Sequence, residues 1–346
     1  GSHEEHKAKI DRIKKIKEEL KMPVAILLDT KGPEIRLGVF EKPAQIVQGQ
    51  EFVITTRDVI GTNQICSISY KNIAAEIKPK SRILINDGLL ELQVIDILND
   101  TDIECVAVNS GTLSSRKGVN IPGLRVNLPY MSEKDISDIE FGIENDVDFI
   151  AASFTQRADD IIQIRKLLEK HKSKIGIIAK IENQEGLDAI DNILEVSDGI
   201  MVARGDLAVE VGHAAVPALQ KRMIRRAREL RRFSITATQM MESMITNPVP
   251  TRAEVSDVAN AVLDGTDAVM CSAETAVGAY PFETVSQMAV ICAAAEKEQD
   301  SLNGVIEPVE FQDPLSTNLA IARGAVTVAR AVHAKAIVAL TESGST

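Results

Sequence analysis

The chain has 346 residues, of which 45% are hydrophobic and 26% are charged, and its formal net charge is −11. This composition is typical of a globular protein with a large core, and the acidic balance disfavours a nucleic-acid-binding surface. No stretch approaches the roughly 18 apolar residues of a membrane helix and no signal peptide is recognisable, so we expect a cytoplasmic protein that binds neither nucleic acid nor membrane.

The N-terminal third predicts a helix, a buried strand and then an all-β module. The pattern of residues 4–20 predicts the helix, and PVAILLDTK (23–31) predicts the strand. Between Arg36 and Pro129, alternating or β-branched runs predict short strands, with a turn at INDG (85–88). Because this module is inserted at the carboxyl end of a strand, we expect it to lie over the strand ends as a lid.

From Asp138 onward, a unit of apolar strand, polar strand end and amphipathic helix recurs. Helices are predicted at segments such as 159–171 and 215–232, and strands at 147–154, 175–182, 198–206, 233–240 and 267–275. Such alternation is typical of a parallel sheet covered on both faces. An open doubly wound sheet would gather its ligand groups at one switch point. Polar residues follow every strand here, which favours a (β/α)₈ barrel of the TIM type.

The C-terminal stretch has a different sequence pattern. Residues 301–314 are typical of a linker, 315–334 predict a helix, and 335–346 predict a strand with a Gly/Ser turn. About thirty residues cannot bury a core alone, so we expect the start of a further α/β domain and a chain that is cut at both ends. The predicted domains are the barrel (1–36 and 129–300), the inserted β lid (37–128), and the linker with the start of the C-terminal domain (301–346).

One strand ends on charged residues. In IIAKIENQEG (177–186), Lys180 and Glu182 are two residues apart and should point the same way. The next strand ends in ARGD, which predicts Asp206 at the same level one strand over. Two carboxylates on neighbouring strand ends suit Mg²⁺, and Lys180 adds a positive charge that could stabilise a transferring phosphoryl group. Gly205 offers a backbone N–H at a helix start.

Several segments resemble, in order and spacing, the motif series of the pyruvate kinases. They are LLDTKGPEIR (27–36), KGVNIPG (117–123), IIAKIENQEGL (177–187), DGIMVARGDLAVE (198–210), ITATQMMESM (235–244) and NPVPTRAEVSDVANAVLDGTDAVM (247–270). The resemblance covers nearly the whole chain. It implies a barrel domain with six of its eight strands present, a β-barrel lid inserted after the third barrel strand, and the start of a C-terminal α/β domain.

The resemblance also implies an activity: phosphoryl transfer from phosphoenolpyruvate to ADP, giving pyruvate and ATP in glycolysis. The implied cofactors are Mg²⁺ (or Mn²⁺) and K⁺, and the implied assembly is a homotetramer. Lys180 and Thr238 would be catalytic, with Thr238 near the point where the enolate is protonated. Substrate binding is implied for Ala203, Arg204, Gly205, Asp206, Thr238 and Ser153, and nucleotide binding for Arg36, Lys117 and Asp87. Glu182 and Asp206 would bind Mg²⁺, and Asp29 and Thr30 would bind K⁺. For Glu34, Ser272 and Glu274 the resemblance implies a place near the site without a definite role.

Part of the family's site is expected to lie outside this sequence. The family's active-site arginine, an ATP-binding histidine, and the asparagine and serine that complete the K⁺ site belong to the preceding segment. We therefore expect this chain alone to be inactive. Two alternatives stay open: a Mg²⁺-dependent aldolase or lyase acting on pyruvate-like substrates, which would need neither the lid nor Arg36 and Lys117, and a non-catalytic fragment.

Overall fold

The computed structural model describes residues 1–124, 128–299 and 317–339. The chain falls into two compact units, Gly1–Ile306 and Glu307–Thr346. Within the described residues, no helix combines the length and the apolarity needed to cross a lipid bilayer.

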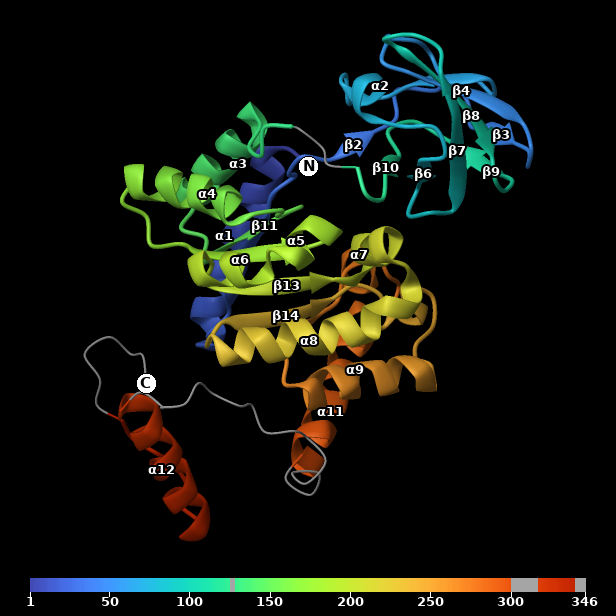
Figure 1. Cartoon of the computed structure of the whole chain (residues 1–346). Helices are drawn as coiled ribbons and strands as arrows, with labels where there is room; N and C mark the ends of the chain where they lie inside the picture. Colours follow the sequence, from blue (N-terminus) through green and yellow to red (C-terminus); the bar gives the residue numbers. More distant parts are fainter. Residues whose placement is uncertain (125–127, 300–316, 340–346) are drawn as a thin grey trace. The chain divides into compact units, whose positions relative to one another are not determined.

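A six-stranded parallel sheet forms the centre of the larger unit (Figure 1). Its strands are, in spatial order, β1 (Leu27–Asp29), β11 (Phe149–Ala152), β12 (Gly176–Ile181), β13 (Gly199–Ala203), β14 (Phe233–Ala237) and β15 (Ala268–Met270). Among these described strands the spatial order follows the chain without the reversal that defines a doubly wound sheet. The prediction of a TIM-type barrel is thereby confirmed, with six strands present.

Amphipathic helices alternate with these strands. Their bounds are α1 (His3–Leu20), α3 (Glu133–Glu144), α4 (Ala158–Lys170), α5 (Gln184–Asp188), α6 (Ile190–Val196), α7 (Arg204–Val211), η1 (His213–Ala215), α8 (Val216–Glu229), η2 (Glu242–Ile245), α9 (Arg252–Asp264), α10 (Ala273–Ala276) and α11 (Pro281–Gln299). Ile161, Ile164 and Leu168 of α4 are fully buried in one core with Ile177 and Ala179 of β12. This period of three and four on the helix against a buried strand is the expected barrel packing.

The predicted strand 198–206 is too long at its carboxyl end. β13 ends at Ala203, and Asp206 lies in the first turn of α7 instead of on a strand. The reason is on the neighbouring strand, where Ala203 pairs with Ala237, the last residue of β14. Thr238 and Gln239 then adopt φ of +70° and +52°, which breaks the extended backbone that a ladder needs.

In its described residues the inserted module is all-β apart from one short helix, α2 (Ile73–Glu76), as predicted. One sheet contains β2 (Ile35–Arg36), β10 (Gly118–Asn120), β6 (Arg82–Ile85), β7 (Leu90–Ile97), β8 (Asp102–Ala107), β4 (Glu51–Thr55) and β5 (Ile65–Ser67); a second pairs β3 (Ala44–Ile46) with β9 (Gly111–Leu113). The module has its own core, including Phe52, Ile83 and Leu92. Its boundaries at 37 and 128 stay predictions, because β2 already begins at Ile35 and residues 125–127 lie outside the described residues.

The C-terminal helix is confirmed as α12 (Thr317–Ala331). The expected linker at 301–314 lies outside the described residues. Of the strand expected at 335–346, residues 335–339 are not in a strand and residues 340–346 are outside the described part of the chain.

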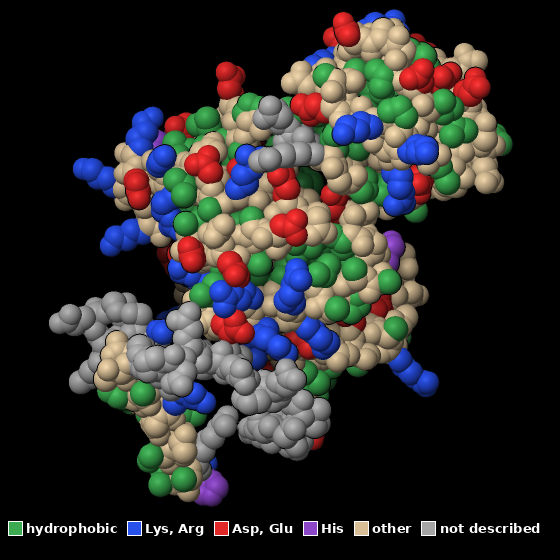
Figure 2. All heavy atoms as spheres, in the orientation of Figure 1, with side chains coloured by type: hydrophobic (Ala, Val, Ile, Leu, Met, Phe, Trp, Pro, Cys, Tyr) green, Lys and Arg blue, Asp and Glu red, His purple; other side chains and the backbone are tan. Residues whose placement is uncertain are grey.

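The basic run 225–232 lies at the end of α8 and just beyond it. Arg226 forms ion pairs with Asp191 at 2.6 Å and with Glu229 at 2.7 Å, and Lys221 pairs with Asp264. On the face seen in Figure 2, acidic and basic side chains are interspersed over α8 and its neighbours. The charges of Arg226 and Lys221 on α8 are therefore compensated by local carboxylates.

Candidate active site

A cavity of about 500 Å³ lies at the carboxyl ends of the parallel strands and is also lined by the β module. It gathers residues that are far apart in the sequence, because the carboxyl ends of parallel strands meet at one edge of a sheet. The predicted site residues among its lining are Asp29, Thr30, Glu34, Arg36, Asp87, Lys117, Ser153, Lys180, Glu182 and Asp206.

Lys180 is the centre of a polar cluster in this cavity. Its Nζ lies 3.1 Å from Glu182 Oε1 and 3.2 Å from Asp29 Oδ1, and it donates to Ser153 Oγ at 2.9 Å. The contact with Glu182 confirms that the two side chains point the same way. Burial opposes the charge of Lys180, but the carboxylates of Glu182 and Asp29 outweigh it, so its pKa is raised. The ammonium group is therefore fixed and charged.

Glu182 is almost completely buried, with 2% of its side chain exposed. Its Oε2 accepts a hydrogen bond from the backbone N–H of Phe154 at 2.6 Å, and Phe154 has φ of +52°. Burial raises the pKa of Glu182 to about 7, with Lys180 opposing the shift and the charge of Asp206 adding to it. Sequence reasoning missed Phe154, because a backbone donor leaves no signature in side-chain chemistry.

The loop after β1 is held against the site by Asp135, a second residue that sequence reasoning missed. Its buried carboxylate accepts from the backbone N–H groups of Lys31 and Gly32, both at 3.1 Å, and from the N–H and the hydroxyl of Ser132 at 2.9 and 2.6 Å. Ser132 and Asp135 form the capping box of α3. The spacing S-x-x-D is the sequence signal that could have identified this clamp.

Asp29 and Thr30, the pair expected at a K⁺ site, differ in the exposure and the hydrogen bonding of their side chains. The carboxylate of Asp29 is 61% exposed, although it also accepts from Ser153 Oγ at 3.1 Å. The hydroxyl of Thr30 donates to Ala151 O at 3.2 Å and accepts from Ser153 N at 3.1 Å. A cation at this place would therefore find the Asp29 carboxylate more readily than the Thr30 hydroxyl.

The predicted nucleotide contacts lie on the lid side of the cavity. Arg36 pairs with Glu34 at 2.5 Å and donates to the carbonyl of Arg116 at 2.7 Å. Asp87 lies in the β6–β7 turn, where Asn86, Asp87 and Gly88 all have φ between +54° and +80°. Lys117 immediately precedes β10 and lines the same cavity.

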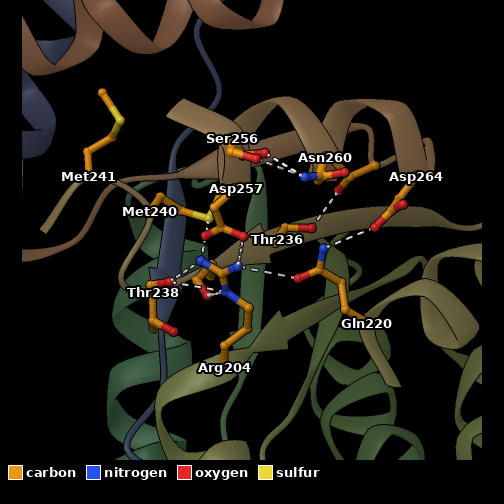
Figure 3. A network of polar contacts seen from close by, with 12 residues as sticks. Arg204, Gln220, Thr236, Thr238, Met240, Met241, Ser256, Asp257, Asn260 and Asp264 are labelled. Atoms are coloured by element: carbon orange, nitrogen blue, oxygen red, sulfur yellow. Dashed lines mark hydrogen bonds and ion pairs between the residues drawn. The ribbon is translucent and has the colours of Figure 1, made fainter. Parts of the chain in front are cut away.

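Other predicted residues are not among the described residues that line the cavity, namely Ala203, Arg204, Gly205, Thr238, Ser272 and Glu274. Thr238 and Gly205 are nevertheless joined, because Thr238 Oγ1 accepts from the N–H of Gly205 at 2.8 Å. Arg204 directs its side chain toward Asp257 and the segment after β14 (Figure 3). Only its backbone is left for a substrate.

The buried carboxylate of Glu274 forms hydrogen bonds to backbone groups of two nearby segments. It is 1% exposed, and its carboxylate accepts from the N–H of Met241 at 3.1 Å and from the N–H of Ser272 at 2.6 Å. These bonds tie the start of α10 to the segment that follows β14. The carboxylate is thus already engaged with backbone donors.

The acidic residues of the cavity fit a divalent cation that is completed by substrate. Burial raises the pKa of Asp206, and the charge of Asp87 raises it further. A cation near Asp206 and Glu182 would relieve the repulsion and the burial of their charges. Within the described residues no three His, Cys, Asp or Glu side chains form a protein-only metal cluster. Mg²⁺ takes one or two protein carboxylates and fills its shell with water and substrate oxygens.

The comparisons with known proteins agree with this geometry. Residues 1–285 match the family described as "Pyruvate kinase, barrel domain". The whole chain is 49% identical to curated proteins named pyruvate kinase from Staphylococcus aureus (strain MRSA252) and Staphylococcus epidermidis, and it spans 59% of their length. A crystal structure of a pyruvate kinase from Cryptosporidium parvum superposes with a TM-score of 0.90 at 42% identity, covering 97% of this chain and 70% of that one.

Proposed function

This chain belongs to the pyruvate kinase family, and from that premise we propose that its site transfers a phosphoryl group from phosphoenolpyruvate to ADP, giving pyruvate and ATP. The activity is proposed for the protein that carries this sequence, because the chain spans 59% of the length of its curated relatives. On the same grounds we propose a glycolytic, cytoplasmic enzyme that assembles as a homotetramer.

The fixed ammonium group of Lys180 is the observation that carries the proposal. In phosphoryl transfer, negative charge spreads over the oxygens of the moving group, and catalysis consists mainly of positioning and electrostatic stabilisation. Lys180 is held by Asp29, Ser153 and Glu182 before any substrate arrives. A charge that is already oriented costs no reorganisation during the reaction.

Glu182 and Asp206 would hold Mg²⁺ or Mn²⁺, and a bound ion of this kind supplies positive charge that polarises phosphoryl and carbonyl oxygens. We assign K⁺ to the side of Asp29 and Thr30, with Glu34 close by. Ser153 and the backbone of Ala203, Arg204 and Gly205 would bind the substrate, with the Ser153 hydroxyl and the Gly205 N–H exchanging their present acceptors, Asp29 and Thr238, for substrate oxygens. Each of these assignments follows from the family motif that the residue occupies.

The lid distinguishes this proposal from an aldolase or lyase. Arg36 and Lys117 come from the β module, and both line the cavity that contains Lys180. Two basic side chains that line the same cavity as a fixed ammonium group suit a nucleotide phosphate that receives the transferred group. A lyase acting on a pyruvate-like substrate would have no use for them.

Thr238 would serve the step after phosphoryl transfer, in which the enolate of pyruvate gains a proton at C3. Because Thr238 Oγ1 accepts from the N–H of Gly205, its own O–H proton remains available to a neighbouring group. The hydroxyl would therefore pass a proton to the enolate carbon, directly or through water, and would regain a proton from solvent.

A coupled assay of ADP-dependent pyruvate formation, with Mg²⁺ and K⁺, tests the function. In the full-length protein, Lys180→Met should lower kcat by about 10²–10³-fold while the far-UV CD spectrum is kept. Lys170→Met, on the exposed last turn of α4, is the matched control and should change nothing. The chain of 346 residues should show little or no turnover alone. The proposal would be refuted if the Lys180→Met variant formed pyruvate as fast as the unaltered protein. It would also be refuted if the unaltered full-length protein formed no pyruvate.

A further inference from the structure

Arg204 belongs to the ARGD motif, but its side chain turns away from the described lining of the cavity and is 11% exposed. Its Nε donates to the carbonyl oxygens of Ala237 and Thr238, both at 3.2 Å, and its Nη2 donates to Thr238 O at 2.7 Å. Its Nη1 forms an ion pair with Asp257 of α9 at 2.8 Å. The guanidinium group therefore connects α9 to the two peptide groups that follow β14 (Figure 3).

Those peptide groups belong to an unusual turn. Thr238 and Gln239 are consecutive non-glycine residues with φ of +70° and +52°, and positive φ is a true outlier for a β-branched residue such as Thr. Strained backbone of this kind persists only where surrounding contacts over-determine it, and it concentrates at functional sites. The bonds from Arg204 to two successive carbonyls are contacts of that kind.

The turn also sets the place of the Thr238 hydroxyl. Oγ1 of Thr238 accepts from the N–H of Gly205 at 2.8 Å, and Gly205 directly precedes Asp206. A rotation of the turn would move this hydroxyl and release the N–H of Gly205. Arg204 thus reaches the proposed site through Thr238 and not by its own contact.

We propose that Arg204, held by Asp257, is a positioning residue that keeps the turn 238–239 in its left-handed conformation and so places the Thr238 hydroxyl for enolate protonation. This inference rests on the proposed function for its catalytic part only. The planar fork of Arg can donate to two carbonyls and a carboxylate at once, whereas Lys offers a compact point charge. Gln220 of α8 supports the fork, since its Oε1 lies 3.4 Å from Nη1 while its Nε2 donates to Asp264 at 3.2 Å.

Hydrogen exchange tests the structural part in this chain without any activity. Arg204→Lys and Asp257→Asn should raise the exchange rate of the Gly205 amide and of peptides covering 237–241 by about tenfold or more, since local opening becomes easier. Exchange in the lid and the melting temperature of the larger unit should change little. Arg226→Lys, which alters an ion-paired arginine on α8, is the matched control. Unchanged exchange at 237–241 in both variants would overturn the inference, and Asp257→Asn, which keeps the shape of the side chain but removes the charge and one acceptor, guards against a failure to fold.

A double-mutant cycle in the full-length protein tests the catalytic part. Arg204→Lys should lower kcat by about tenfold or more, and KM for ADP should stay within about twofold because Arg36 and Lys117 are untouched. In a Thr238→Ala background, Arg204→Lys should have almost no further effect, since residues that act as one unit are not additive. Additive losses would show that Arg204 does not act through Thr238. If the unaltered full-length protein formed no pyruvate, the proposed function would fail while the exchange result still decided the structural part.

Discussion

Gly32→Ala should destabilise the chain more than other glycine substitutions at left-handed positions. Gly32 has φ of +68°, and an added Cβ would lie 2.6 Å from the carbonyl oxygen of Ser153. The left-handed backbone costs an L-residue about 1–2 kcal/mol, and a clash that cannot relax costs about 1–3 kcal/mol more. The clash cannot relax freely, because Ser153 also donates to Asp29 and accepts from Lys180. We therefore expect a loss of about 2–5 kcal/mol in the free energy of unfolding.

Gly49→Ala separates the two costs. Gly49 has φ of +80°, but nothing lies within 4 Å of an added Cβ, so only the backbone cost of about 1–2 kcal/mol applies. Urea unfolding of the two variants and the unaltered chain measures the difference, with the slope m checked for constancy. Equal losses in both variants would show that the carbonyl of Ser153 moves easily and that the loop after β1 does not hold Ser153 in place.

Two further predictions concern buried carboxylates. Asp135→Ala should cost about 3 kcal/mol in urea unfolding, because the N–H groups of Lys31 and Gly32 lose their acceptor, whereas Glu133→Ala, at an exposed position in the first turn of the same helix, should cost under about 1 kcal/mol; equal losses would count against the clamp. Burial raises the pKa of Glu182 from 4.5 to about 7, so the folded state binds this proton more tightly than the unfolded state does. Without metal, the free energy of unfolding should therefore fall by about 3 kcal/mol as the pH rises from below 4.5 to 7. Glu182→Gln should abolish this fall, and the same dependence on pH in the variant would show that Glu182 is not the group responsible.

The main contacts of the site could be predicted where they follow from strand periodicity. Lys180 lies on β12 and Glu182 directly follows the last residue of that strand, Ile181, so the alternation of side chains was enough to place them together. The same reasoning predicted Asp206 on a strand, which was wrong, because β13 ends at Ala203 and Asp206 lies in the first turn of α7. The left-handed Thr238 ends the ladder of β14 at Ala237, and no local pattern announces such a conformation in a threonine.

Long-range polar contacts could not be predicted from the sequence. The motif implied that the backbone of Arg204 meets the substrate, and it gave no sign of where the side chain lies; Asp257, which is 53 positions away, and two carbonyls engage the guanidinium group. Glu274 was expected at the rim and instead accepts from backbone N–H groups. Both outcomes depend on which partner is nearest in space once the helices are packed, and that information is not present in the neighbouring residues.

The charges around the cavity explain why the proposed reaction needs cations. Among the described lining residues, six are acidic and four are basic, although phosphoenolpyruvate and ADP are both anions. One of the basic groups, Lys180, is already occupied by Glu182 and Asp29, and another, Arg36, by Glu34. The carboxylate of Asp206 and the exposed part of the Asp29 carboxylate therefore repel both substrates until cations bind there. Cation binding should precede substrate binding, so that phosphoenolpyruvate affinity rises with divalent ion concentration and collapses in EDTA.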